Sequence, residues 1–198
     1  MNGGVCWWHS LLTRRQIYLT VFRPDLPKPS EAQVEEIYGH YLDMGVVEIP
    51  GYANFYDFSL EWREFLQKKL ERWQKMDAFK FKWIDGLSGE TSTTPQDLEG
   101  KMDVLHYDIT LNKMIVWQML QMPGVTSHAW LVADMKKLPD GYDLTVVDSN
   151  FPGTYTVHYH NGDDAVRILN YPEFVPYTGN SRDFAKIRRA QNDYCSDL

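Results

Sequence analysis

Three residues far apart in the chain have side chains suited to nucleophilic catalysis. Cys6 follows two glycines in "GGVCWWHS", at the first turn of an expected helix, where unpaired N–H groups and the helix dipole favour a thiolate. His128 begins the expected strand "HAWLVADM" and could serve as the base that such a nucleophile needs. Asp148 ends the next expected strand, in "DLTVVDSN", and could orient the imidazole. Together these residues indicate cysteine-dependent acyl chemistry.

The connection between the two strands predicts that His128 and Asp148 meet. The segment "KKLPDG" is typical of a hairpin turn, which makes the strands antiparallel neighbours. The start of the first strand then lies beside the end of the second. A separation of twenty residues in the sequence therefore becomes a side-chain contact at one edge of the sheet. An imidazolium there would pair with the Cys6 thiolate.

Helical patterns fill the first half of the chain, and strand patterns follow. Helices are expected over residues 6–22, 30–45, 58–76, 94–109 and 182–192, with Ser30 and Gln33 forming a capping box and Ser181 capping the last helix. Strands are expected in "MIVWQMLQ", "HAWLVADM", "DLTVVDSN", "TYTVHYH" and "AVRILN". Short turn segments separate these strands, which is typical of an antiparallel meander. The order predicts an α+β fold in two layers.

The length of 198 residues suits one domain with a shared core. The segment "GLSGETSTTP" is the expected boundary between a helical lobe over about 1–90 and a lobe of one helix plus antiparallel sheet over about 91–198. The whole chain, 1–198, is then a single domain with its catalytic residues divided between the two lobes.

Charge and hydropathy exclude two classes of partner. The formal charge is −7, and the basic clusters "TRR" and "KIRR" are short, so a nucleic-acid interface is not expected. No apolar run is long enough to predict a membrane span. Cys6 and Cys195 allow either one disulfide or two free thiols. The sequence leaves open an upstream leader, pro-segment or domain, and removal of a leader would imply a secreted or periplasmic protein.

Three motifs resemble those of papain-like cysteine peptidases. "CWWHS" is similar to the Cys-Trp-x-x-Ser start of the catalytic helix, "SHAWLVA" to the strand that carries the base, and "VVDSN" to the strand end that carries the third catalytic residue. The resemblance covers nearly the whole chain and implies a papain-like fold with Cys6, His128 and Asp148 as the triad. It also implies hydrolysis of a peptide or protein substrate through a thioester, with no metal and no organic cofactor.

The resemblance also indicates where the oxyanion hole and the substrate cleft would lie. The family places an oxyanion-hole Gln a few residues before the nucleophile, and residues 1–5 contain no Gln. Gln118 and Gln121 are therefore candidates for that role, beside the backbone N–H of Cys6. Candidates for the substrate cleft are Trp7, Trp130 and Asn150.

The same residues are compatible with two other functions. "GVC", "HAW" and "VVD" also resemble the transglutaminase-like branch, in which the same triad passes an acyl group to an amine. A catalytically inactive module that binds a partner protein is a third hypothesis, because an isolated Cys in an aromatic helix usually acts as a small hydrophobe. His158 and His160 share one strand face but lack a third metal ligand at suitable spacing, which favours an exposed strand.

Overall fold

The computed structural model describes residues 5–79, 92–121, 127–168, 173–176 and 181–196. Helices come first and an antiparallel sheet follows, which confirms the α+β class. In chain order the elements are α1 (Cys6–Leu19), β1 (Thr20–Arg23), α2 (Glu31–Leu42), β2 (Val47–Pro50), α3 (Phe55–Glu61), α4 (Arg63–Phe79), α6 (Pro95–Asn112), β3 (Val116–Gln121), β4 (Ser127–Leu138), β5 (Gly141–Val147), β6 (Thr154–His160), β7 (Val175–Pro176) and α7 (Ser181–Ser196).

The predicted helix starts are largely confirmed. Ser30 caps α2 through a capping box, in which its side chain accepts from the backbone N–H of Gln33 and Gln33 accepts from the backbone N–H of Ser30. Thr94 caps α6 one residue before Pro95, which suits the first helical position. The last helix differs from the prediction, because α7 includes Ser181 as its first residue and continues to Ser196.

The prediction of one N-terminal helix to residue 22 is wrong at its end. Helix α1 stops at Leu19, and residues 20–23 form β1, which pairs in parallel with β2. The segment "TVFR" favours a strand because Thr, Val and Phe suit a pleated surface, and Pro24 restricts the residue before it to extended backbone. The partner strand β2 supplies the long-range pairing that the sequence pattern did not reveal.

The helix predicted over residues 58–76 is two helices. Helix α3 ends at Glu61, α4 begins at Arg63, and Trp62 lies between them with φ −96° and ψ 14°. The indole N–H of Trp62 donates to the hydroxyl of Tyr52 at 3.0 Å. This contact holds the Trp62 ring between α3 and α4. The apolar residues that follow one another at helical spacing in the sequence therefore belong to two helices.

The sheet has the strand order β6-β5-β4-β3-β7, and the predicted meander of β3 to β6 is confirmed. The fifth predicted strand, "AVRILN", is wrong in its described part, where only an isolated bridge joins Val166 to Phe174. The fifth strand of the sheet is instead β7, which pairs with β3. Strand β7 has only two residues, which is too short for a strand pattern to be recognised in the sequence.

Some predicted features lie outside the described residues. These are the glycines of "MNGG", the part of the boundary segment "GLSGETSTTP" up to Thr91, and the turn "PGVT" before β4.

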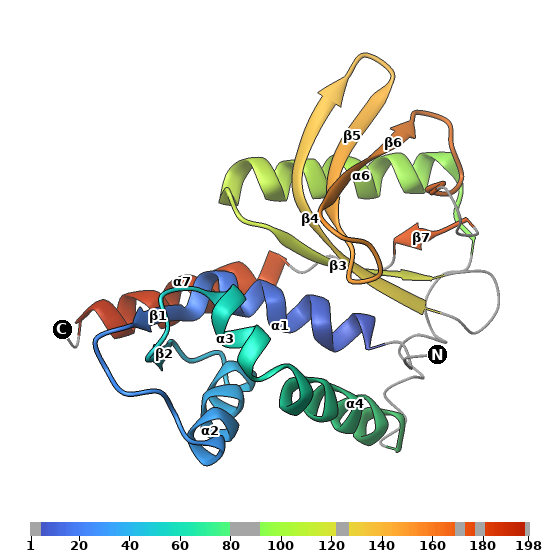
Figure 1. Ribbon diagram of the computed structural model, residues 1–198. Helices are drawn as coiled ribbons and strands as arrows, with labels where there is room; N and C mark the ends of the chain where they lie inside the picture. The colour runs from blue at the N-terminus through green and yellow to red at the C-terminus, as the bar shows by residue number, and fades with distance from the viewer. Residues whose placement is uncertain (1–4, 80–91, 122–126, 169–172, 177–180, 197–198) are drawn as a thin grey trace.

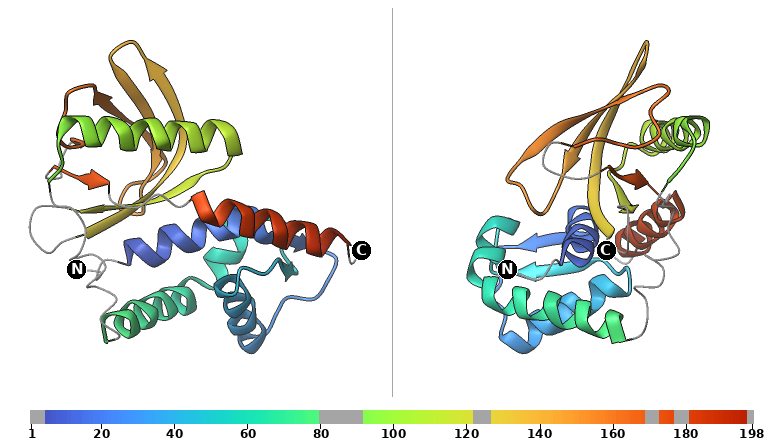
Figure 2. Two further views of the ribbon diagram at one scale, coloured as in Figure 1. Left: turned by 180° about the vertical axis from the view of Figure 1, so that it is seen from behind. Right: turned by 90° about the vertical axis from the view of Figure 1, so that its right-hand side faces the viewer.

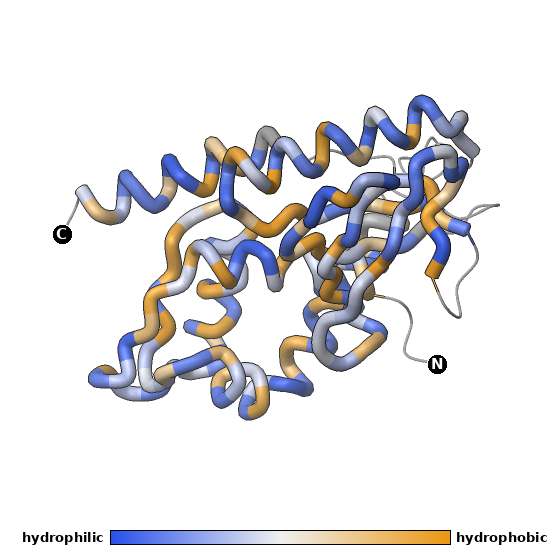
Figure 3. The backbone as a smooth tube through the Cα atoms, turned by 90° about the horizontal axis from the view of Figure 1, so that it is seen from above, coloured by the Kyte–Doolittle hydropathy of each residue, from blue (hydrophilic) through white to orange (hydrophobic). Residues whose placement is uncertain are grey.

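Helix α1 lies between the sheet and the other N-terminal helices, with α7 alongside it (Figure 1; Figure 2, right). One apolar cluster joins α1 to the sheet and contains Leu11, Trp117, Met119, Ala129 and Leu131. Hydrophobic and hydrophilic residues alternate along α7 (Figure 3), whose Phe184 and Ile187 are buried. The N-terminal helix therefore contacts elements from both parts of the chain.

The fully buried side chain of Arg14 fixes the position of α1. Its Nε donates to the backbone carbonyl of Ile115 at 2.7 Å, just before β3. Its guanidinium lies 3.6 Å from the carboxylate of Asp183 and over the ring of Phe184 on α7. One arginine thus connects α1 to both the sheet and the C-terminal helix.

The hairpin between β4 and β5 needs glycine at residue 141. A Cβ there would overlap the carbonyl oxygen of Tyr159 on β6, and φ is +154°. We expect Gly141→Ala to lower the free energy of unfolding by about 2 kcal/mol or more, because strand backbones must separate. Urea titration followed by circular dichroism measures this change.

The matched control for that variant is Gly39→Ala in α2. A Cβ at Gly39 meets nothing within 4 Å. Alanine there should raise the free energy of unfolding by about 0.5–1 kcal/mol, because it restricts the unfolded chain and favours the helix. Equal effects of the two substitutions would contradict the steric role of Gly141.

Candidate active site

Cys6 is the first residue of α1, and its side chain is half-buried. Val5 occupies the N-cap position and supplies no side-chain cap, while the backbone N–H of His9 donates to the carbonyl of Val5. Cys6 therefore lies in the first turn of a helix, where the backbone N–H groups have no partner within the helix and favour a negative charge. Cys6 and Cys195 are both free thiols.

The strand register brings His128 and Asp148 together. His128 is the second residue of β4, and Asp148 follows β5 directly. Leu131 pairs with Val147, which aligns the start of β4 with the end of β5. Nε2 of His128 lies 2.8 Å from Oδ2 of Asp148, and both side chains are almost fully buried.

Two further groups hold the carboxylate of Asp148. The backbone N–H of Asn150 donates to Oδ1 at 2.9 Å, and the hydroxyl of Tyr155 donates to Oδ2 at 3.2 Å. Burial by itself raises the pKa of Asp148, but the hydrogen bonds from His128, Asn150 and Tyr155 outweigh it and hold that pKa below its ordinary value. Asp148 is therefore an anion at neutral pH.

His128 interacts with both Asp148 and Cys6. Burial by itself lowers the pKa of His128, but hydrogen bonds to the Asp148 carboxylate and the Cys6 sulfur, with their charges, raise it to about 9. Since Nε2 is occupied by Asp148, Nδ1 is the ring nitrogen that can face the thiol. The Phe174 ring stacks on the imidazole with a centroid distance of 6.0 Å and covers one face of it.

Ser10 connects the cysteine helix to the histidine strand. Its hydroxyl lies 2.7 Å from the carbonyl oxygen of Cys6 and 3.1 Å from that of Ala129, so its single proton is shared between the two. Ala129 is the residue after His128. Ser10 is the last residue of the motif "CWWHS", and its two contacts fix the spacing between Cys6 and the strand that carries His128.

The two glutamines proposed for the oxyanion hole lie on opposite faces of β3. Gln118 pairs with Trp130 and Leu120 pairs with His128, so Gln118 shares the face of the imidazole. Oε1 of Gln118 accepts from the indole N–H of Trp130 at 2.8 Å. Gln121 is one residue beyond Leu120 and faces the other side, where its side chain is fully buried.

The three predicted cleft residues have different surroundings. Trp130 is 0% exposed and packs near Phe174 in the core, so it lines no open cleft. The indole N–H of Trp130 donates to Gln118 within the sheet, so the side chain can be buried without an unsatisfied polar group. Trp7 is half-buried and packs at a tilt against Trp117. Asn150 acts through its backbone on Asp148, as described above.

A cleft of about 320 Å³ lies between α1 and the chain that follows β5. His9, one turn after Cys6, and Thr13 line it from α1, while Asp148 and Phe151 line it from the other side. His9 and Tyr155 are among the residues near Cys6, His128 and Asp148 that the sequence did not point to. The strand alternation of "TYTVHYH" was the available signal for Tyr155, because it predicted which side chains share a face.

No group of three or more His, Cys, Asp or Glu within the described ranges is arranged to hold a metal ion. Among the helices that the structure describes, none is both long and apolar enough to cross a membrane. No family model, curated protein or solved structure matches the chain. A function is therefore inferred from the geometry of these residues and from the sequence motifs.

The contact with Asp148 should control the protonation of His128. In the wild type, the imidazole should titrate near pH 9, so it stays protonated through neutral pH. Asp148→Asn removes the largest contribution that raises the pKa and leaves the effect of burial, so the midpoint should fall by about two pH units. NMR of the imidazole Cε1–H across the pH range measures both midpoints.

Asp143→Asn is the control, since Asp143 lies on the same strand, β5, and pairs with the exposed His158. It should leave the midpoint of His128 unchanged. An unchanged midpoint in Asp148→Asn would show that the carboxylate does not hold the imidazolium.

Proposed function

We propose that this chain is a cysteine-dependent hydrolase that cleaves an amide or peptide bond through a thioester. The observation that carries the proposal is the position of His128, which hydrogen-bonds to Asp148 through one nitrogen and interacts with the Cys6 sulfur. A buried base between a nucleophile and an orienting carboxylate is the arrangement used in nucleophilic acyl transfer.

In the first step, the Cys6 thiolate attacks the carbonyl carbon and forms the C–S bond. The electron pair of the carbonyl moves to oxygen, and the backbone N–H of Cys6, in the first turn of α1, donates a hydrogen bond to the oxyanion in this proposal. His128 then donates its proton to the amide nitrogen as the C–N bond breaks. The amine leaves, and a thioester remains on Cys6.

In the second step, His128 is neutral and accepts a proton from water. The water oxygen attacks the thioester carbonyl, the C–S bond breaks, and the acid product leaves with Cys6 as the thiolate and His128 as the imidazolium. Asp148 keeps its charge throughout and stabilises the imidazolium in each resting state. At the end of one cycle, Cys6, His128 and Asp148 have the same protonation states as at its start.

The order of the motifs supports a papain-like form of this chemistry. The helix with Cys6 precedes a sheet whose strands carry first His128 and then Asp148, as the resemblance to papain-like peptidases implies. Acyl transfer to an amine differs only in the acceptor of the second step. A protein-binding module without turnover would need neither the thiol nor the raised pKa of His128.

The reactivity of Cys6 should depend on His128. At pH 7, alkylation of Cys6 by chloroacetamide should be at least about tenfold slower in His128→Ala than in the wild type, because the imidazolium that pairs with the thiolate is gone. Mass spectrometry of peptides resolves Cys6 from Cys195. Exposed Cys195 should react equally in both proteins and serves as the internal control. Equal rates for Cys6 would contradict the pair.

Hydrolysis of peptidyl aminocoumarin amides should be lost in Cys6→Ala and retained in Cys195→Ser. The rate should fall as the pH rises through about 9, because His128 must carry the proton that the leaving amine receives. Fluorescence of the released coumarin measures the rate.

Added cadaverine tests whether water or an amine accepts the acyl group in the second step. Free acid as the main product supports the hydrolase, and amide product in excess would favour the transferase instead.

A further inference from the structure

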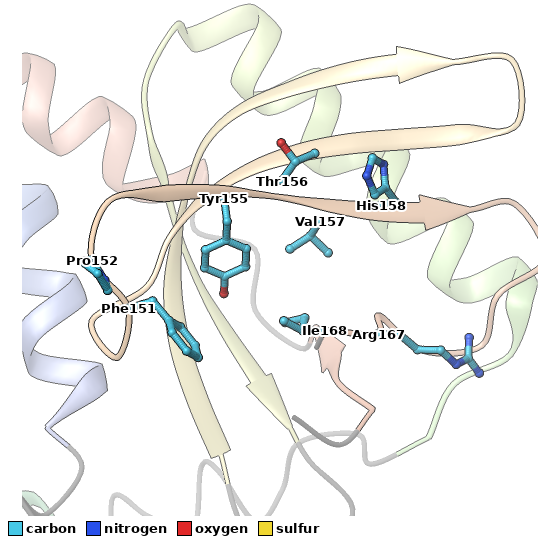
Figure 4. Close-up of a pocket in the computed structure, with 8 residues that line it drawn as sticks. All are labelled: Phe151, Pro152, Tyr155, Thr156, Val157, His158, Arg167 and Ile168. Atoms are coloured by element: carbon cyan, nitrogen blue, oxygen red, sulfur yellow. The ribbon is translucent and has the colours of Figure 1, made fainter. Parts of the chain in front are cut away.

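A second cavity, of about 530 Å³, opens beside β6, and we refer to it as the β6 slot. Figure 4 shows Tyr155 and Val157 extending from β6 towards Ile168, while Thr156 and His158 extend from the opposite side of the strand. Phe151 and Pro152 line one end and Arg167 the other. A cavity of this size accommodates a small ligand or a few side chains of a peptide.

The inner end of the β6 slot adjoins the catalytic site. Tyr155 forms part of the slot wall, and its hydroxyl is 3.2 Å from the Asp148 carboxylate. Phe151 lines both the slot and the cleft beside α1, and it packs edge-on against Tyr155. A group bound in the slot would therefore lie next to the residues that orient His128.

The inner wall of the slot is apolar. Val157 is buried, Ile168 is half-buried, and the ring of Tyr155 lies between them and Phe151. An aromatic or branched aliphatic group would lose contact with water on entering this space, at about 25 cal/mol of favourable free energy for each Å² of apolar surface removed.

Arg167 lines the outer end of the slot, and the carboxylates that surround it outnumber its single positive charge. Arg167 lies 3.3 Å from Asp163, 3.0 Å from Asp164 and 3.1 Å from Glu173, so three carboxylates share one guanidinium. An incoming anion would compete with all three for Arg167 and would be repelled by their excess charge. A cation would be attracted by the same excess. Charge complementarity therefore selects a positively charged group at this end.

We propose that the β6 slot binds an apolar group that carries a positive charge at its outer end, as in a hydrophobic-basic segment of a peptide substrate. The assignment of this ligand as substrate rests on the proposed hydrolase function. The apolar part packs against Tyr155, Val157 and Ile168, and the cation lies near the carboxylates around Arg167. The slot thereby selects substrates by hydrophobicity and charge beside the triad.

Three ligands with one apolar body test the charge preference without any turnover. Phenylbutylamine, phenylbutanol and phenylbutyrate are titrated into the Cys6→Ala protein, and binding is followed by NMR shifts of the Val157 and Ile168 methyl groups. The amine should bind at least about tenfold more tightly than the carboxylate, and about 0.5 M salt should reduce this ratio. Equal affinity for the three, or a preference for the carboxylate, would overturn the proposal.

Two variants locate the site. Ile168→Trp fills the slot and should abolish amine binding, whereas Ile17→Trp, at an exposed position of α1 outside the slot, should not. Glu173→Gln removes one exposed carboxylate beside Arg167 and should lower the ratio of amine to carboxylate affinity by about threefold, with Asp193→Asn on α7 as the control. Unchanged binding in Ile168→Trp, with the fold intact by circular dichroism, would overturn the location.

Amine binding and amide hydrolysis, measured on the same protein, distinguish failure of the proposed slot from failure of the proposed hydrolase function. Tight amine binding in a wild-type protein that hydrolyses no amide would support the slot and overturn the hydrolase. Hydrolysis that is indifferent to hydrophobic-basic residues, together with absent amine binding, would overturn the slot and leave the hydrolase standing.

Discussion

The hydrogen bond between His128 and Asp148 is the constraint on which the site depends. It requires β4 and β5 to pair in one register, since a shift of one residue would turn either side chain to the opposite face of the sheet. The two-residue turn between Leu138 and Gly141 and the contact of Gly141 with Tyr159 both fix that register. The contact between His128 and Asp148 at one end of the hairpin is therefore set partly by backbone geometry at the other end.

The His128–Asp148 pair is buried, so its charges must be stabilised by hydrogen bonds within the protein. A carboxylate away from water is costly unless donors surround it, and Asp148 has His128, Asn150 and Tyr155 as donors. The same argument applies to Arg14, whose buried guanidinium lies between the backbone at Ile115 and the carboxylate of Asp183. Arg14 therefore holds α1 in one position relative to the sheet and α7, whereas the donors to Asp148 all come from the sheet and the segment that follows β5. Apolar packing alone is less directional and would fix that position less closely.

The structure differs from the sequence pattern at residues 20–23, Trp62 and Trp130. Residues 20–23 continue a helical pattern in the sequence, yet they pair with β2, because a partner strand 27 residues further along offers backbone hydrogen bonds. Trp62 lies between α3 and α4, where its indole N–H donates to the hydroxyl of Tyr52. Trp130 was expected at a cleft and lies in the core, since Gln118 satisfies its N–H inside the sheet. In each case the residues make a contact that the local sequence pattern does not record.

The sequence by itself determined the α+β class, the order of the four meander strands, the capping of α2, and the placement of His128 and Asp148 at neighbouring strand ends. These features follow from local periodicity and from turn chemistry, which a linear pattern records. Tertiary structure alone decided how α1 lies against the sheet, which brings Cys6 to His128 and Ser10 to Ala129. Those contacts depend on the packing of elements remote in the chain, and no local pattern of residues encodes a packing geometry.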